Sequence, residues 1–133
     1  MTTSNLMSVV DKCLIDLIDK VGCGWMDGGC MTLASAVNQI FPDSIFYHIS
    51  RCVNLVDHVV LYFPEKAQYF DADGFQSERE LFIKMKKQEL TDVSALVEMN
   101  ESHFNQIEIF TELEVLFIKY YNEFIVSEIE VLT

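Results

Sequence analysis

Three residues in the first half of the chain carry side chains that together could activate a thiol for attack on a carbonyl group: Cys30, His58 and Asp71. Cys30 follows two glycines and opens a predicted helix, where the positive end of the helix dipole favours thiolate over thiol. His58 lies in an otherwise apolar predicted strand, and Asp71 ends the next one. A nucleophilic thiolate, an imidazole that accepts its proton and a carboxylate that orients the imidazole make an activated-thiol centre.

The relation of His58 to the carboxylates depends on the turn between the two strands. We expect a tight hairpin turn centred on Glu65 and Lys66. In that register His58 falls opposite Asp73 and diagonal to Asp71, with all three on one face of the sheet. Asp73 is therefore a possible alternative orienter. A change of one residue in the turn would place the imidazole and the carboxylates on opposite faces.

The loop before Cys30 contains four of the five glycines of the chain, within residues 22–29. Such a density indicates unusual backbone angles or the close approach of another group to the backbone. We expect Gly28, Gly29 and Trp25 to border the substrate. The first turn of the following helix also offers backbone N–H groups that can hold a developing oxyanion.

The elements that position these residues follow from hydrophobic periodicity and turn signals. Helices are expected over residues 5–21, 30–40, 77–89 and 102–124. Strands are expected over residues 44–50, 56–63, 67–71 and, more weakly patterned, 125–132. Residues 90–100 fit neither pattern. The predicted fold class is α+β, with two N-terminal helices, a small mainly antiparallel sheet and C-terminal helices in one domain, residues 1–133.

The order of these features resembles that of the papain-like and transglutaminase-like superfamily. In that group a cysteine opens a helix after a glycine-containing loop, a strand with histidine follows, and a neighbouring strand ends in aspartate. Residues 58–62 (His-Val-Val-Leu-Tyr) and 69–74 (Tyr-Phe-Asp-Ala-Asp-Gly) look like the His-strand and Asp-strand of transglutaminase-like proteins. The resemblance spans roughly residues 22–75.

This resemblance implies a papain-like or transglutaminase-like core with Cys30 as nucleophile, His58 as base and Asp71 as orienter. The activities it implies are peptide hydrolysis, deamidation of glutamine side chains, acyl transfer and crosslinking, each through a thioester on Cys30. The substrate would be a protein or peptide, and we expect no cofactor and no metal. Papain-like peptidases place a glutamine before the cysteine as an oxyanion donor, whereas Gly24 and Trp25 stand near that position here.

Composition narrows the possible partners and the compartment. The chain has 21 acidic and nine basic residues, a net charge of −12, which disfavours direct binding of nucleic acid or anionic membranes. No apolar run approaches the ~20 residues of a membrane span, and residues 1–11 lack the pattern of a signal peptide. We therefore expect a cytoplasmic protein with free thiols. Its cysteines lack the paired spacing of a structural zinc site.

Two other functions fit the same sequence. One is a small acidic, non-enzymatic inhibitor or binding protein that docks on a basic partner protein through carboxylates of its C-terminal half. Such a protein would tolerate Cys30→Ala. The other is a papain-like domain that has lost catalysis and serves as a binding module.

Lys84, Lys86 and Lys87 form the one basic cluster in the sequence, which we expect to be a solvated helix face.

Overall fold

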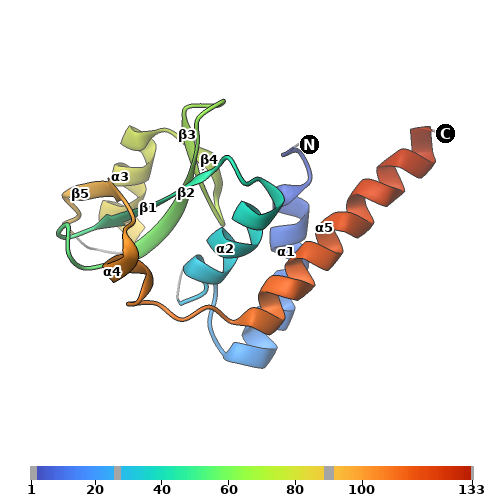
Figure 1. Cartoon of the computed structure of the whole chain (residues 1–133), viewed down its shortest axis with the longest axis horizontal. Coiled ribbons are helices and arrows are strands. Elements are labelled where there is room, and N and C mark those ends of the chain that lie inside the picture. Colours follow the sequence, from blue (N-terminus) through green and yellow to red (C-terminus); the bar gives the residue numbers. More distant parts are fainter. Residues whose placement is uncertain (1–2, 26–27, 89–91, 133) are drawn as a thin grey trace.

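The computed structural model describes residues 3–25, 28–88 and 92–132. Within these residues the helices are α1 (Leu6–Val21), α2 (Cys30–Ile40), α3 (Glu78–Gln88), α4 (Glu101–Phe104) and α5 (Thr111–Leu132). The strands are β1 (Ile45–Ser50), β2 (His58–Phe63), β3 (Gln68–Asp71), β4 (Gly74–Gln76) and β5 (Ala95–Glu98). Helices α1, α2 and α5 lie together beside the sheet (Figure 1). The predicted α+β class, with two N-terminal helices before an antiparallel sheet, is confirmed.

The strands form one sheet in the order β4-β3-β2-β1-β5, and every neighbouring pair is antiparallel. Leu61 of β2 lies opposite Phe70 of β3. That register centres the hairpin on Glu65 and Lys66, as predicted from the sequence. β2 is the middle strand, and its first residue, His58, pairs with Ile49 of β1.

The two faces of the sheet carry separate hydrophobic cores, because successive side chains of a strand point to opposite faces. On one face, Val59 and Leu61 of β2 pack in the main core with buried residues of α1, α2 and α5. On the other face, Val60 packs with Leu81 and Met85 of α3. Helix α2 therefore reaches the site from one layer, and α3 reaches it from the other.

The C-terminal region differs from the prediction of one helix over 102–124 followed by a strand. Helix α4 ends at Phe104, and α5 begins at Thr111 and continues through the predicted strand to Leu132. The break has a tertiary cause: Phe104 stacks on Phe46 of β1, while the N–H of Phe110 donates to Oγ1 of Thr32 in α2, at 2.9 Å. Neither α5 nor any other helix in the described ranges is long and apolar enough to cross a membrane.

Two strands were missed by the sequence analysis. β5 lies in the segment 90–100 that fitted no pattern, and it pairs with β1. β4 returns against β3 after a two-residue turn and is only three residues long, too short to show a periodicity. The predicted end of the third helix, Glu89, lies outside the described residues.

Phe117 offers a test of the main core. It is fully buried on α5 and stacks edge-on against Trp25, with ring centroids 6.2 Å apart. We expect Phe117→Ala to lower the free energy of unfolding by about 3–5 kcal/mol, because it leaves a cavity. Val115 is on the same helix but 62 % exposed, so Val115→Ala should change stability by about 0.5 kcal/mol or less. Urea unfolding of both variants measures the difference; equal losses would contradict this packing.

Candidate active site

The structure brings Cys30, His58 and Asp71 together at one end of the hairpin. Cys30 is the first residue of α2, His58 the first of β2 and Asp71 the last of β3. α2 packs across β2 and β3, and this places the start of the helix beside the start of the strand. All three residues are nearly buried, with exposed fractions of 7 %, 2 % and 3 %.

The imidazole of His58 connects the other two side chains. Its Nε2 lies 2.9 Å from Oδ2 of Asp71, and the ring is also hydrogen-bonded to the thiol of Cys30. The ring therefore bonds to the carboxylate on one side and the thiol on the other, as an activated-thiol centre requires.

Asp73, the alternative orienter, is placed differently. Its side chain is 47 % exposed, and its Oδ2 lies 3.3 Å from Nζ of Lys84. Its backbone N–H donates to Oδ1 of Asp71 at 2.9 Å. Asp73 thus supports the carboxylate of Asp71, while Asp71 itself contacts the imidazole.

The carboxylate of Asp71 receives four donors. Oδ2 accepts from the imidazole of His58 and the ammonium of Lys84. Oδ1 accepts from Nε2 of Gln76, at 2.7 Å, and from the backbone N–H of Asp73. Four donors match the approximate number of lone-pair sites on an ionised carboxylate. They fix both its orientation and its charge.

Gln76 and Lys84 are contacts that the sequence analysis missed. Gln76 could be placed only once β4 was known to fold back on β3. Lys84 was predicted to lie on a solvated helix face, which is wrong for this residue: its side chain is 10 % exposed. The available signal was its position beside Leu81 and Met85, which form the apolar stripe of α3.

Opposing effects act on the Cys30 thiol. Burial disfavours the thiolate, but hydrogen bonds from His58 and from the backbone N–H groups of Val59 and Met31, with the charge of the imidazolium, outweigh it. The pKa of Cys30 consequently lies below that of an ordinary thiol. This is the direction that a nucleophilic cysteine needs.

His58 and Asp71 are shifted in a complementary way. Burial disfavours the imidazolium, but its hydrogen bonds to Asp71 and Cys30 raise the pKa of His58 to about 9. Burial likewise opposes ionisation of Asp71, yet His58 and Lys84 lower the pKa of its carboxyl group to about 2. At neutral pH these shifts favour an imidazolium on His58 and a carboxylate on Asp71. The lowered pKa of Cys30 makes its thiol easier to ionise than an ordinary one.

The loop before Cys30 borders the site through Trp25. Gly28 adopts a positive φ of 104°, and a Cβ on Gly29 would lie 3.0 Å from the carbonyl oxygen of Gly24, so both positions favour glycine for backbone reasons. The indole of Trp25 donates to the carbonyl of Val10 at 3.0 Å and borders the space beside Cys30. The predicted contact of this loop with a substrate remains a prediction.

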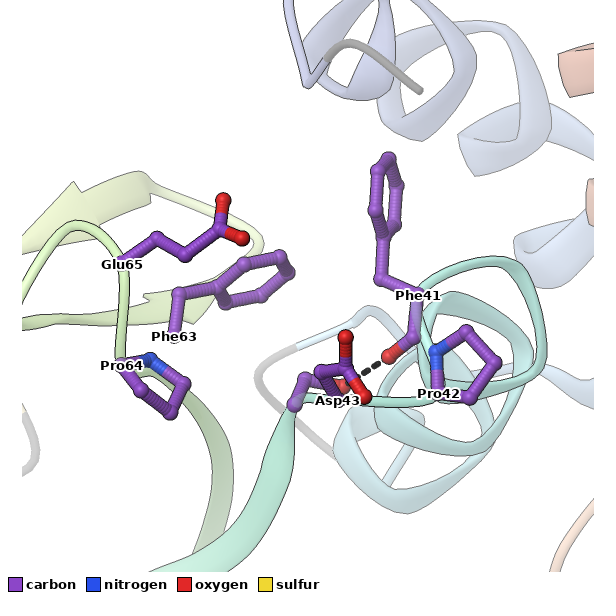
Figure 2. A pocket seen from close by; sticks show the side chains of 7 residues that line it. Phe41, Pro42, Asp43, Phe63, Pro64 and Glu65 are labelled. Carbon is purple, nitrogen blue, oxygen red and sulfur yellow. Dashed lines mark hydrogen bonds between the residues drawn. The ribbon is translucent and has the colours of Figure 1, made fainter.

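The space between Trp25, Cys30, His58 and Asp71 has no room for a water-sized group. A more open cavity of about 220 Å³ lies at the other end of β2, beyond Phe63. Figure 2 shows Phe63 and Glu65 on one side of it and Phe41, Pro42 and Asp43 on the other. Its lining contains neither cysteine nor histidine, so the thiol site remains the stronger candidate despite its smaller volume.

The other two histidines form a separate buried pair. The rings of His48 and His103 lie 4.3 Å apart, centroid to centroid. Nδ1 of His48 bonds to Oγ of Ser50 at 2.7 Å, and Nε2 of His103 bonds to the carbonyl of Val53 at 2.7 Å. These contacts tie β1 to α4 and to the segment after β1, which is a structural role.

Across the described ranges, no group of three or more histidine, cysteine, aspartate or glutamate side chains is placed to hold a metal ion. The four cysteines are free thiols. In comparisons with protein-family models, curated proteins and solved structures, nothing matches this chain. The geometry of the site is therefore the main indication of what this protein does.

The choice between Asp71 and Asp73 as orienter can be tested by the titration of His58. Removing the carboxylate charge in Asp71→Asn should lower the pKa of His58 by about one unit or more, because the imidazolium loses its nearest anion. Asp73→Asn, two residues away, should leave it nearly unchanged. Ring resonances followed by NMR measure both, with His48 and His103 as internal references. Equal shifts in the two variants would assign the role to neither.

Asp71 should also affect acid stability. Its pKa is about 2 in the folded chain, below the ordinary value of about 4 that we assign to the unfolded chain. The stability it contributes is therefore present above pH ~4 and is lost as the pH falls towards 2, by about 2–3 kcal/mol. Denaturant unfolding should show a shallower loss over this window in Asp71→Asn. A parallel loss in wild type and variant would contradict the low pKa.

Proposed function

We propose that this protein is a thiol-dependent hydrolase or acyltransferase that acts on an amide, peptide or acyl bond through a thioester on Cys30. The observation that supports this most is the hydrogen-bonded chain of Cys30, His58 and Asp71 at the start of a helix. A thiol, an imidazole and a carboxylate in this order supply a nucleophile, a proton carrier and an orienter.

In the first step the Cys30 thiolate attacks the carbonyl carbon of the substrate, and the carbonyl electrons move onto oxygen. Collapse of this tetrahedral species breaks the bond to the leaving group. The imidazolium of His58 gives its proton to the leaving amine or alcohol. The products are a thioester on Cys30 and a neutral imidazole that remains bonded to Asp71.

In the second step neutral His58 takes a proton from water or from another nucleophile, which then attacks the thioester carbon. The carbon–sulfur bond breaks, and Cys30 returns as thiolate beside an imidazolium. Water gives hydrolysis or deamidation, whereas an amine gives acyl transfer or crosslinking. The carboxylate of Asp71 keeps the ring in one orientation through both steps.

The developing oxyanion needs donors other than a glutamine side chain, since none precedes Cys30 in the loop. Backbone N–H groups in the first turn of α2 have no intrahelical partners and point towards the helix N-terminus. Because the site is closed, the substrate must displace side chains that border it. Trp25, which belongs to the glycine loop, lines the space beside the thiol, so it is one of the side chains that must move.

The alternative of an acidic docking protein makes a different prediction about the thiol. A protein that only docks on a basic partner does not need a cysteine of low pKa, whereas an enzyme that forms a thioester does.

The substrate class that we propose is a protein or peptide, because a thiolate can attack the carbonyl carbon of a peptide bond or of a glutamine side-chain amide.

The test is the pH dependence of iodoacetamide alkylation at each cysteine, read by mass spectrometry in wild type and in His58→Ala. We expect Cys30 to react near pH 6 in wild type and at least ~10-fold more slowly there in the variant. Loss of the imidazole should raise the pKa of Cys30, and each unit of increase lowers the fraction of thiolate about tenfold at this pH. Exposed Cys52 and buried Cys13 are internal controls. Their profiles should be the same in both proteins.

A second readout addresses the thioester. Incubation with p-nitrophenyl acetate should acetylate Cys30, and intact-mass analysis should show the adduct disappear in Cys30→Ala and form slowly in His58→Ala. If Cys30 alkylates like an ordinary thiol with or without His58, the catalytic proposal is wrong. The acidic surface would then be the place to look for a partner.

A further inference from the structure

Lys84 is the charged group on the far side of the candidate site from Cys30. It lies on α3, the helix that covers the opposite face of the sheet, and its ammonium contacts Oδ2 of Asp71, the same oxygen that bonds to His58. A second contact joins it to Asp73 at 3.3 Å. The site is thus built from both layers of the fold.

The charges alternate along this chain of contacts. When Cys30 is ionised, its thiolate, the imidazolium of His58 and the carboxylate of Asp71 carry one net negative charge in a nearly buried space. Burying an uncompensated charge is costly. The ammonium of Lys84, whose side chain is 10 % exposed, makes the buried set neutral.

We propose that Lys84 is a positioning residue of the thiol site, which holds Asp71 and balances the buried charge so that Cys30 can remain ionised beside His58. This inference rests on the proposed function and adds a fourth member to the three residues that carry it. Lys84 does not touch the reacting atoms. It acts through Asp71.

A purely structural role for Lys84 would be to fasten α3 to the hairpin between β3 and β4. Both roles predict some loss of stability on mutation, so stability does not separate them. The pH profile of Cys30 does. The titratable side chains that face this chain of contacts are Cys30 from α2, His58 from β2, Asp71 and Asp73 from the hairpin, and Lys84 itself.

The experiment compares Lys84→Gln with Lys84→Arg in the alkylation assay. Both side chains can donate to Asp71, but only arginine retains the positive charge. We expect Lys84→Gln to raise the apparent pKa of Cys30 by about one unit and to slow alkylation near pH 6 about tenfold. Lys84→Arg should stay within about threefold of wild type. Lys86→Gln, the same charge change at an exposed position of α3, should leave the profile unchanged.

Circular dichroism checks that each variant is folded, and Lys84→Met serves as a second uncharged variant of similar length should Lys84→Gln not fold. The same upward shift is expected in it. If the wild-type profile persists in the folded uncharged variant, Lys84 only fastens the helix, and this inference is overturned while the proposed function stands. If wild-type Cys30 itself behaves as an ordinary thiol, the proposed function fails, and the role of Lys84 fails with it.

Discussion

The hydrogen bond between Nε2 of His58 and Oδ2 of Asp71 joins two strand ends directly beneath the first turn of α2, at 2.9 Å. It forms only if the hairpin keeps its register, because a slip of one residue would turn the two side chains to opposite faces. It also needs α2 to cross β2 so that Cys30 meets the free side of the ring. The other polar contacts of the site, from Asp73, Gln76 and Lys84, are made to the same carboxylate of Asp71.

The environment, rather than the residue type, decides which cysteine thiol ionises more readily. Cys13 is buried in the main core, where loss of solvent and nearby Asp16 raise the pKa of its thiol to about 12. Cys30 is also buried, yet its pKa is lowered, because an imidazolium and two backbone N–H groups stabilise its thiolate. Burial without donors raises the pKa of a thiol, whereas burial beside hydrogen-bond donors can lower it.

Burying several charged groups costs desolvation free energy, and the packing around the site helps to offset it. Apolar residues of α1, α2 and α5 pack against one face of the sheet, and α3 covers the other. This packing excludes water from the site and strengthens the interactions among its charges. The same packing leaves no room for another molecule beside Cys30, so any group that reaches this thiol must move the side chains that line the space.

Short-range patterns were enough to predict α1, α2, the β2–β3 hairpin and the order of the three chemical groups along the chain. The glycines before Cys30, the apolar periodicity of α2 and the turn residues after Phe63 act over a few positions, so they can be recognised without a structure. Tertiary packing sets which carboxylate meets His58: Asp71 lies beside the imidazole, whereas Asp73 contacts Lys84 of α3. Tertiary packing also broke the predicted helix at Phe104, and it brought Gln76 and Lys84 to Asp71. Contacts between residues distant in sequence depend on how whole elements pack, which a local pattern does not encode.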